Sequence, residues 1–256
     1  MQDALPLRRI LDPRPSAETA AYPYRESVNI PLDELAQRRN ELPRKGRTLQ
    51  VAASEELYRE AQRVLLSLGI NGEAPTALDW RVGPRPRGRL WSPSEFLLRE
   101  APLIKQETAI DLGCGSGRDA VWLAANGWKV MAIDHLSDAI DMARDLERRY
   151  LAQPSINWRP EDYLASKPQA FDLIFCSFSF RKPLTNKLID FAHEGTVALI
   201  ETFTLEHRRT FNKPKEEAVL AIEELQGLEK WTIEHVEQGW HYERHTIRAR
   251  LRCTMS

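Results

Sequence analysis

A glycine-rich turn between two apolar runs is the feature that most constrains this chain. The first run, residues 108–112, leads into three glycines at alternate positions, Gly113, Gly115 and Gly117. A helical pattern follows them, and a second apolar run, residues 129–134, ends on Asp134. Glycines spaced in this way let the backbone turn sharply and approach a ligand where a side chain would collide. The segment therefore predicts a strand, a ligand-binding turn, a helix and a second, parallel strand.

Asp134 stands about 20 residues beyond the start of that turn, the distance at which a carboxylate accepts the hydroxyls of a bound ribose. A lone glycine turn is a weak signal, whereas a strand, turn, helix, strand and terminal acid in one short unit is a specific one. We therefore expect a ribose-containing ligand on this turn.

Strands and helices alternate through the second part of the chain. The expected strands are residues 108–112, 129–134, 156–160, 171–177 and 196–203. The expected helices are residues 94–100, 118–126, 136–151, 182–193 and 215–226. Such alternation predicts right-handed crossovers onto a parallel sheet. Two final strands, residues 231–237 and 245–253, are joined by a short turn and are expected to pair antiparallel.

The composition changes between residues 71 and 93, where glycines and prolines crowd together. Such a segment cannot hold a long helix or a central strand, so we expect a linker or arm with the domain boundary near Asp79. The expected parts are a domain at residues 1–78, a linker at residues 79–93 and a domain at residues 94–256. Four arginines lie in the linker, and solvated charge is their expected role, with capture of an anionic substrate as the alternative: Arg81, Arg85, Arg87 and Arg89.

The first domain has a mixed pattern of short elements. The expected strands are residues 7–11, 27–30 and 48–52, and the expected helices are residues 33–40 and 55–68, the second ending at Gly69.

Charge and cysteine usage exclude several classes of protein. The chain has 36 basic and 37 acidic residues, which gives no electrostatic reason to expect a nucleic acid or an anionic membrane as partner. The start does not resemble a signal peptide, and no apolar run approaches the ~20 residues that span a bilayer. Cys114, Cys176 and Cys253 are far apart in sequence, as in a reduced, cytoplasmic protein without disulfides.

The sequence Asp-Leu-Gly-Cys-Gly-Ser-Gly at residues 111–117 closely resembles the first motif of class I S-adenosylmethionine-dependent methyltransferases. The resemblance covers about residues 90–253. Leu-Ala-Ala-Asn-Gly at residues 123–127 and Leu-Trp-Ser-Pro at residues 90–93 make the chain most similar to the small-molecule branch with the tellurite-resistance and thiopurine methyltransferases. The resemblance implies an α/β, Rossmann-like sheet of seven strands, mostly parallel, with an antiparallel C-terminal hairpin. Dehydrogenases share the glycine turn but prefer Gly-x-Gly-x-x-Gly, so the spacing here favours S-adenosylmethionine as cofactor.

The resemblance also implies the roles of individual residues. Asp111 would orient the amino group of the cofactor, the three glycines would lie beneath its methionine part, Asp134 would accept both ribose hydroxyls, and Asp162 would accept from the adenine amine. Each acid has an alternative role as a strand-end residue that caps the next helix. Six further residues are expected to contact the cofactor or to lie next to it: Cys114, Arg118, His135, Glu161, Tyr163 and Cys176. We interpret Cys114 as a compact packed side chain, not a nucleophile.

The methyl acceptor is less well indicated. The Asn/Asp-Pro-Pro-aromatic and Pro-Cys sequences of nucleic-acid methyltransferases are absent after residue 176, so we expect a small-molecule acceptor such as a thiol or a chalcogen oxyanion. Six residues are candidates for its pocket, with surface charge or core packing as their alternative roles: Trp91, Ser177, Phe178, Arg181, Arg208 and His245. If a general base is needed, His245 and His241 are candidates, although a structural histidine is the preferred interpretation of both. The sequence assigns no catalytic residue and no metal site.

Residues 7–70 resemble a small α/β rhodanese domain. Asp12-Pro13-Arg14 is similar to the start of that family, and residues 27–35 are similar to its strand-to-helix segment. A working rhodanese needs a cysteine thiolate in its catalytic loop, but the resemblance places Ala52 there, with Glu55 and Glu56 adding negative charge. The domain is therefore expected to be inert, serving as a structural module or for protein binding or self-association.

The leading hypothesis is a cytoplasmic, S-adenosylmethionine-dependent methyltransferase that acts on a small molecule. Two alternatives stay open. The protein could sense S-adenosylmethionine without turning it over, or it could be a dehydrogenase.

Overall fold

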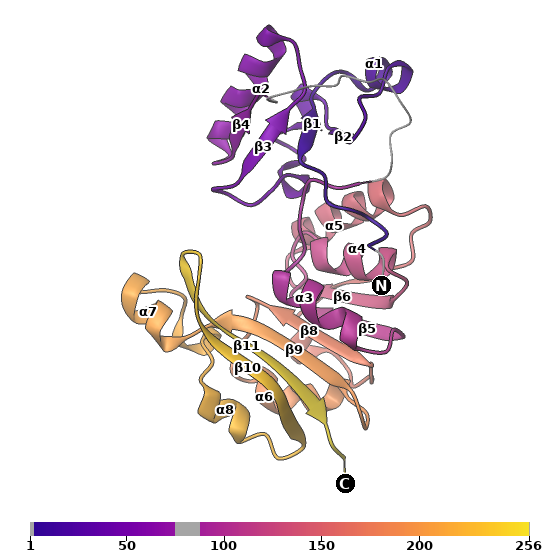
Figure 1. The fold of residues 1–256 in the computed structure, drawn as a ribbon. Coiled ribbons are helices and arrows are strands. Elements are labelled where there is room, and N and C mark those ends of the chain that lie inside the picture. Colours follow the sequence, from indigo (N-terminus) through magenta and orange to yellow (C-terminus); the bar gives the residue numbers. More distant parts are fainter. Residues whose placement is uncertain (1–2, 75–87, 256) are drawn as a thin grey trace. The chain divides into compact units, whose positions relative to one another are not determined.

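The computed structural model describes residues 3–74 and 88–255, which form two compact units (Figure 1). The first unit extends to Ser92 and the second begins at Pro93. The boundary expected near Asp79 lies outside the described residues, as do Arg81, Arg85 and Arg87. Residues 88–92, expected to end the linker, belong to the first unit.

A four-stranded parallel sheet in the order β2-β1-β3-β4 organises the first unit. Its strands are β1 (Ile10–Asp12), β2 (Ser27–Asn29), β3 (Thr48–Val51) and β4 (Asn71–Glu73). Its helices are α1 (Ser16–Ala21) and α2 (Glu55–Ser67). Leu11, Leu49 and Leu65 are fully buried in its apolar core. The solvated charge expected of Arg89 is wrong, because this side chain is only 1% exposed, with Nη2 2.9 Å from Asp3 Oδ2.

The expected helix at residues 33–40 is wrong. Two 3₁₀ turns, Leu32–Glu34 and Arg39–Glu41, replace it. Arg38 pairs with Glu34 at 2.8 Å and with the buried Glu41 at 2.6 Å, so ion pairs hold the turns in place of a continuous helix.

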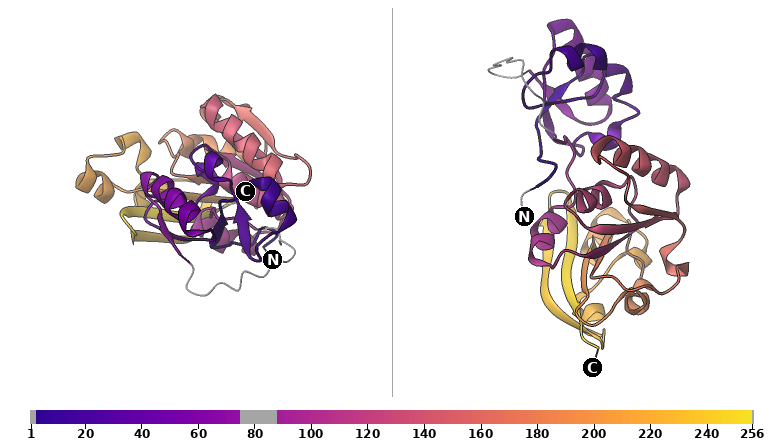
Figure 2. Two further views of the ribbon diagram at one scale, coloured as in Figure 1. Left: turned by 90° about the horizontal axis from the view of Figure 1, so that it is seen from above. Right: turned by 90° about the vertical axis from the view of Figure 1, so that its right-hand side faces the viewer.

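The second unit is built on a seven-stranded sheet in the order β10-β11-β9-β8-β5-β6-β7. Its strands are β5 (Thr108–Leu112), β6 (Lys129–Asp134), β7 (Asn157–Pro160), β8 (Leu173–Ser177), β9 (Val197–Phe203), β10 (Trp231–His241) and β11 (Arg244–Cys253). β11 pairs antiparallel with both β10 and β9, and the other neighbours are parallel. The yellow β10–β11 hairpin forms one edge of the sheet (Figure 2), which confirms the expected architecture.

Six helices accompany this sheet within the described residues: α3 (Glu95–Glu100), α4 (Arg118–Ala125), α5 (Ser137–Tyr150), α6 (Leu184–Lys187), α7 (Leu205–Phe211) and α8 (Ile222–Gln226). The expected helix at residues 182–193 is α6 followed by a 3₁₀ turn, Leu188–Phe191. The expected helix at residues 215–226 is broken, because Leu220 N donates to Phe203 O at 3.0 Å and Val219 bridges to the end of β9. Sequence analysis missed α7, which Thr204 caps by accepting from His207 N.

β5 positions the site because it is the strand from which the crossovers diverge. It pairs with β6 on one side and with β8 on the other. Ligands of open α/β sheets bind beyond the carboxyl ends of strands at such a switch point. None of the helices that the structure describes has the length and apolar character needed to cross a bilayer.

Candidate cofactor and acceptor site

The three glycines after β5 serve different purposes, although all have positive φ, at +75°, +53° and +81°. A Cβ atom at Gly113 would lie 2.2 Å from Cβ of Ser179, and one at Gly117 would lie 2.7 Å from Cβ of Ala143. A Cβ atom at Gly115 would meet nothing within 4 Å. Packing therefore requires two of the glycines, while the third leaves open space above the turn.

Asp111 lies at the end of β5 and is only 2% exposed. The N–H of Ala120 in α4 donates to its carboxylate, but Oδ2 has no hydrogen-bond partner among the described residues. Burial, and then the nearby Asp119 and Asp134, raise the pKa of Asp111 well above its usual range. A buried carboxyl group with an open oxygen is suited to a cationic ligand.

Asp134, at the end of β6, holds the turn from the neighbouring strand. Its Oδ2 accepts from Gly115 N and its Oδ1 accepts from Leu136 N, both at 2.9 Å. Each carboxylate oxygen keeps a second lone pair for another donor. The side chain of His135 is mostly exposed, with Nδ1 3.6 Å from Asp134 Oδ1.

Asp162 and Arg181 form an ion pair that sequence reasoning did not foresee. Nη1 of Arg181 lies 2.9 Å from Oδ2 of Asp162, and Nη2 bonds to Oδ1. The hydrogen bonds from Arg181 are the largest cause of the lowered pKa of Asp162. The guanidinium also lies over the ring of Tyr163, whose hydroxyl donates to Ser179 O at 2.7 Å. The pair therefore joins the loop after β7 to the loop after β8. In that first loop, Glu161 accepts from Ser166 Oγ at 2.9 Å.

The three cysteines are buried thiols. Burial raises the pKa of Cys114, in the glycine turn, and of Cys253, in β11. It raises the pKa of Cys176 to about 12. Because the thiolate is the nucleophile, none of the three is set up as a nucleophile.

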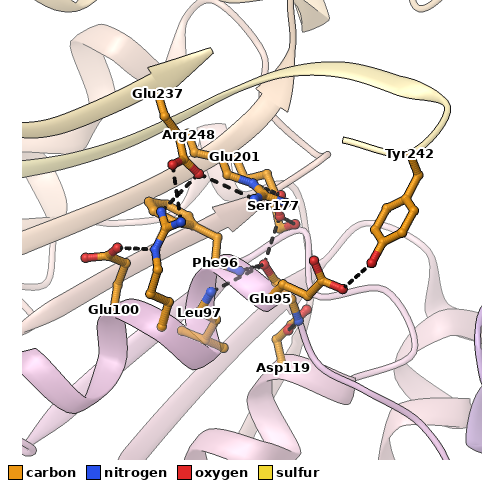
Figure 3. A network of polar contacts seen from close by, with 12 residues as sticks. Glu95, Phe96, Leu97, Glu100, Asp119, Ser177, Glu201, Glu237, Tyr242 and Arg248 are labelled. Atoms are coloured by element: carbon orange, nitrogen blue, oxygen red, sulfur yellow. Dashed lines mark hydrogen bonds and ion pairs between the residues drawn. The ribbon is translucent and has the colours of Figure 1, made fainter. Parts of the chain in front are cut away.

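Glu201 is the centre of a polar network beside the end of β8 (Figure 3). It is 2% exposed and accepts from Ser94 Oγ at 2.8 Å, Ser177 Oγ at 3.0 Å and Arg248 Nε at 2.7 Å. Ser94 also donates its backbone N–H to Asp119 Oδ1 at 2.6 Å. Sequence reasoning missed Glu201, whose signal was a single acid inside the apolar run of β9.

The remaining acceptor candidates take different positions. Phe178 follows β8 with φ of +55°, a conformation rare for a residue with a side chain. Nδ1 of His245 lies 2.7 Å from Thr204 Oγ1, and Arg208 donates to Pro214 O at 2.7 Å. Trp91 belongs to the first unit, so its role near the cofactor stays a prediction, as does that of Arg118 at the start of α4.

Comparison with known proteins agrees with this geometry. Residues 109–195 match the family model described as a methyltransferase domain. No curated protein sequence matches the chain. Residues 3–74 and 88–255 contain no group of three His, Cys, Asp or Glu residues that could hold a metal ion.

Solved structures share the fold of the second unit. The N-methyltransferase NodS from Bradyrhizobium japonicum WM9, in complex with S-adenosyl-L-homocysteine, is 19% identical with a TM-score of 0.52, covering 62% of this chain and 84% of NodS. TehB from Haemophilus influenzae is 19% identical with a TM-score of 0.52, covering 64% of this chain and 63% of TehB. The second unit therefore has the fold of the class I S-adenosylmethionine-dependent methyltransferases.

Proposed function

We propose that the protein transfers the methyl group of S-adenosylmethionine to a small-molecule acceptor. The observation that carries this proposal is the unpartnered Oδ2 of Asp111, buried beside the glycine turn that Gly115 leaves open. NodS, which shares the fold, is bound to the demethylated form of this cofactor.

The residues around the turn fit S-adenosylmethionine. Asp111 would accept from its ammonium group, and the backbone at Gly115 would lie against its methionine part. Asp134 would accept from the ribose with the lone pairs that Gly115 and Leu136 leave free. The Asp162–Arg181 pair, with Tyr163, would border the adenine. When bound, the cofactor supplies an electrophilic methyl group on a sulfonium sulfur.

The chain itself contributes position and exclusion of water, which suffice for attack by an ionised nucleophile. Glu201 is not suited to take a proton, because three donors already surround its carboxylate. A soft anionic acceptor needs no base, so we propose a thiol that has already lost its proton to solvent and reacts as the thiolate, or a chalcogen oxyanion. The fold shared with TehB supports the small-molecule branch.

Calorimetric titration and a transfer assay test this function. We expect S-adenosylmethionine and S-adenosylhomocysteine to bind and NADH not to bind. We also expect labelled methyl groups to reach at least one member of a panel of thiols, selenite, tellurite and phenols. Binding of NADH in place of S-adenosylmethionine would establish a dehydrogenase. Tight cofactor binding without transfer to any acceptor would favour a sensor.

We also propose that the first unit is an inert rhodanese-like domain, which serves as a structural or protein-binding module in the cytoplasm. The buried ion pair of Arg14 and Asp12, 2.8 Å apart, lies at the start of the resemblance. Ala52 follows β3 directly and is fully buried. We expect no transfer of sulfur from thiosulfate to cyanide by the whole chain. Measurable transfer would contradict this assignment.

A further inference from the structure

Ser94 lies at the start of α3 and uses every hydrogen-bonding group of its side chain. It is 1% exposed, and its hydroxyl donates to Oε2 of Glu201 at 2.8 Å. The same hydroxyl oxygen accepts from Phe96 N at 3.2 Å and from Leu97 N at 3.4 Å, and so caps the helix. A hydroxyl group has one proton and two lone pairs, so these three contacts fix its orientation. An N-cap needs only the accepted bonds, so capping alone does not account for the bond to Glu201.

The backbone of Ser94 contacts the acidic side of the candidate cofactor site. Its N–H donates to Oδ1 of Asp119, in the first turn of α4, at 2.6 Å. Burial is the main cause of the raised pKa of Asp111, and the negative charge of Asp119 is the next. A cation bound to Asp111 would offset the repulsion between the two carboxylates, which favours a charged Asp119 and a stronger hydrogen bond from Ser94 N.

The hydroxyl of Ser94 is connected to the acceptor side of the site through Glu201 (Figure 3). Oε2 of Glu201 also accepts from Ser177 Oγ at 3.0 Å, so one carboxylate oxygen joins the start of α3 to the end of β8. Its Oε1 accepts from Arg248 Nε at 2.7 Å, and this ion pair offsets the buried negative charge. The backbone carbonyl of Glu201 accepts from Phe178 N at 2.8 Å. Glu201 therefore holds Ser177 and Phe178, the two residues after β8 that are expected to face the acceptor.

We propose that Ser94 is a positioning residue for methyl transfer, because it couples the bound cofactor to the end of β8. The inference rests on the proposed function. The ammonium group of S-adenosylmethionine at Asp111 would strengthen the bond from Ser94 N to Asp119 and hold the start of α3 in place. Ser94 Oγ then fixes Glu201, and with it the residues that face the acceptor. A thiolate or a chalcogen oxyanion is thereby placed for in-line attack, and the cofactor binds before the acceptor.

Amide hydrogen exchange tests the link between the cofactor and α3 without an acceptor. The whole protein is compared with and without saturating S-adenosylhomocysteine, which retains the ammonium group. We expect the ligand to slow exchange at least fivefold in residues 95–101, as well as in residues 111–117. Asp119→Asn keeps an oxygen for Ser94 N but removes the charge, so the ligand should slow exchange in its residues 95–101 at most twofold. Wild-type protection of residues 95–101 in this variant would overturn the link.

Steady-state kinetics test the link between α3 and Glu201. The acceptor is the member of the panel of thiols, selenite, tellurite and phenols to which the wild-type protein transfers methyl groups fastest. Ser94→Gly keeps the backbone N–H and a residue that N-caps tolerate. We expect it to lower kcat at least tenfold and to change the KM for S-adenosylmethionine less than threefold. Ser94→Thr, which keeps the hydroxyl group, should restore most of the loss. Ser54→Gly, the same substitution at the exposed N-cap of α2, is the matched control and should change neither constant.

A double-mutant cycle shows whether Ser94 acts through Glu201. Glu201→Gln removes the charged acceptor of the Ser94 hydroxyl, so Ser94→Gly should lower kcat less than threefold in that background. Independent effects of the two substitutions would overturn the inference, and so would wild-type kcat in Ser94→Gly. Thermal unfolding is measured for every variant. If Glu201→Gln does not fold, Ser177→Ala takes its place in the cycle, because it breaks the same connection at the end of β8.

The order of measurements separates this inference from the proposed function. S-adenosylhomocysteine is titrated first, and its failure to bind would contradict the proposed function. Binding that does not slow exchange in residues 95–101 of the wild-type protein would overturn the inference alone. Tight binding without methyl transfer to any member of the panel would contradict both.

Discussion

At the scale of single residues, the buried carboxyl group of Asp111 destabilises the ligand-free fold, and a bound cation would remove this destabilisation. This carboxyl group is buried with one unpartnered oxygen, near Asp119 and Asp134. We predict that Asp111→Asn weakens S-adenosylmethionine binding at least tenfold, about 1.4 kcal/mol, while the ligand-free protein unfolds at the same or a higher temperature at pH 7. Calorimetry and thermal unfolding measure the two effects. Asp141→Asn, at an exposed ion pair of α5, is the matched control and should affect neither.

The raised pKa of Asp111 also predicts a pH dependence. An ammonium group needs the ionised carboxylate, so the affinity of the wild-type protein for S-adenosylmethionine should rise as the pH increases through that raised pKa. The limiting slope below the pKa is about tenfold per pH unit. The stability of the ligand-free protein should change with pH in the opposite direction to the affinity. The stability that the protonated group contributes is present at low pH and is lost as the pH rises through the pKa in the folded state. Asp111→Asn should show neither trend, and an unchanged pH profile in this variant would contradict the assignment.

Gly113 and Gly115 give a matched pair of substitutions, since both have positive φ. We predict that Gly115→Ala folds with a loss of about 1–2 kcal/mol from backbone strain but weakens cofactor binding, because its methyl group would project into the open space above the turn. Gly113→Ala should lose more stability, since its Cβ would lie 2.2 Å from Cβ of Ser179. Adding Ser179→Gly should recover part of that loss. Urea unfolding and cofactor titration of these three variants test the prediction, and normal cofactor affinity in Gly115→Ala would contradict this placement.

The candidate site was partly predictable residue by residue. The glycine turn and the acids at 111 and 134 follow from one contiguous motif, and the structure brings them together around Gly115. The Asp162–Arg181 pair was not predictable, because it joins residues on two different loops. Glu201 was missed because the register of β8 against β9 sets it opposite Ser177.

At the scale of elements, the buried carboxylate of Glu147 connects α5 to β7 and to the segment that precedes it. Oε1 of Glu147 accepts from Ser155 N at 2.7 Å and Ile156 N at 2.8 Å, while Oε2 accepts from Trp158 Nε1 at 2.7 Å. We predict that Glu147→Gln costs about 1–3 kcal/mol of stability, because the new amide group opposes the indole N–H with a second donor. Urea unfolding measures the loss.

A double-mutant cycle isolates the cause. Trp158→Phe removes the indole N–H, so it should cost less in the Glu147→Gln background than in the wild-type protein. Asp145→Asn, at an exposed ion pair on the same helix, is the control and should stay near wild type. Additive effects of the Glu147 and Trp158 substitutions would contradict the explanation.

Sequence patterns predicted elements well where local and tertiary preferences agree. β5 and β6 have their expected bounds, because each is an apolar run closed by a turn. The helix expected at residues 215–226 failed because the N–H of Leu220 bonds to Phe203 O, a contact that no local pattern contains. β10 continues to His241, since pairing with β11 extends it past the expected end at Glu237.

At the scale of the whole molecule, the candidate cofactor site is built from residues of the second unit. We predict that S-adenosylmethionine slows amide hydrogen exchange in residues 111–117 and 134–136 of the intact protein. Peptides from β1 to β4 should exchange at unchanged rates. Mass spectrometry with and without the ligand checks both parts, and S-adenosylmethionine at saturation without protection of residues 111–117 would contradict the site.

Because the three thiols are buried, their rates of chemical labelling report local opening of the fold. An alkylating reagent reaches them only when the surrounding segment opens, so the rate of labelling under native conditions counts those openings. Cys114 lies in the glycine turn and Cys253 at the end of β11. A single labelling experiment therefore measures local opening in two separate regions. A ligand bound on the turn should therefore slow the alkylation of Cys114 and leave the alkylation rate of Cys253 unchanged.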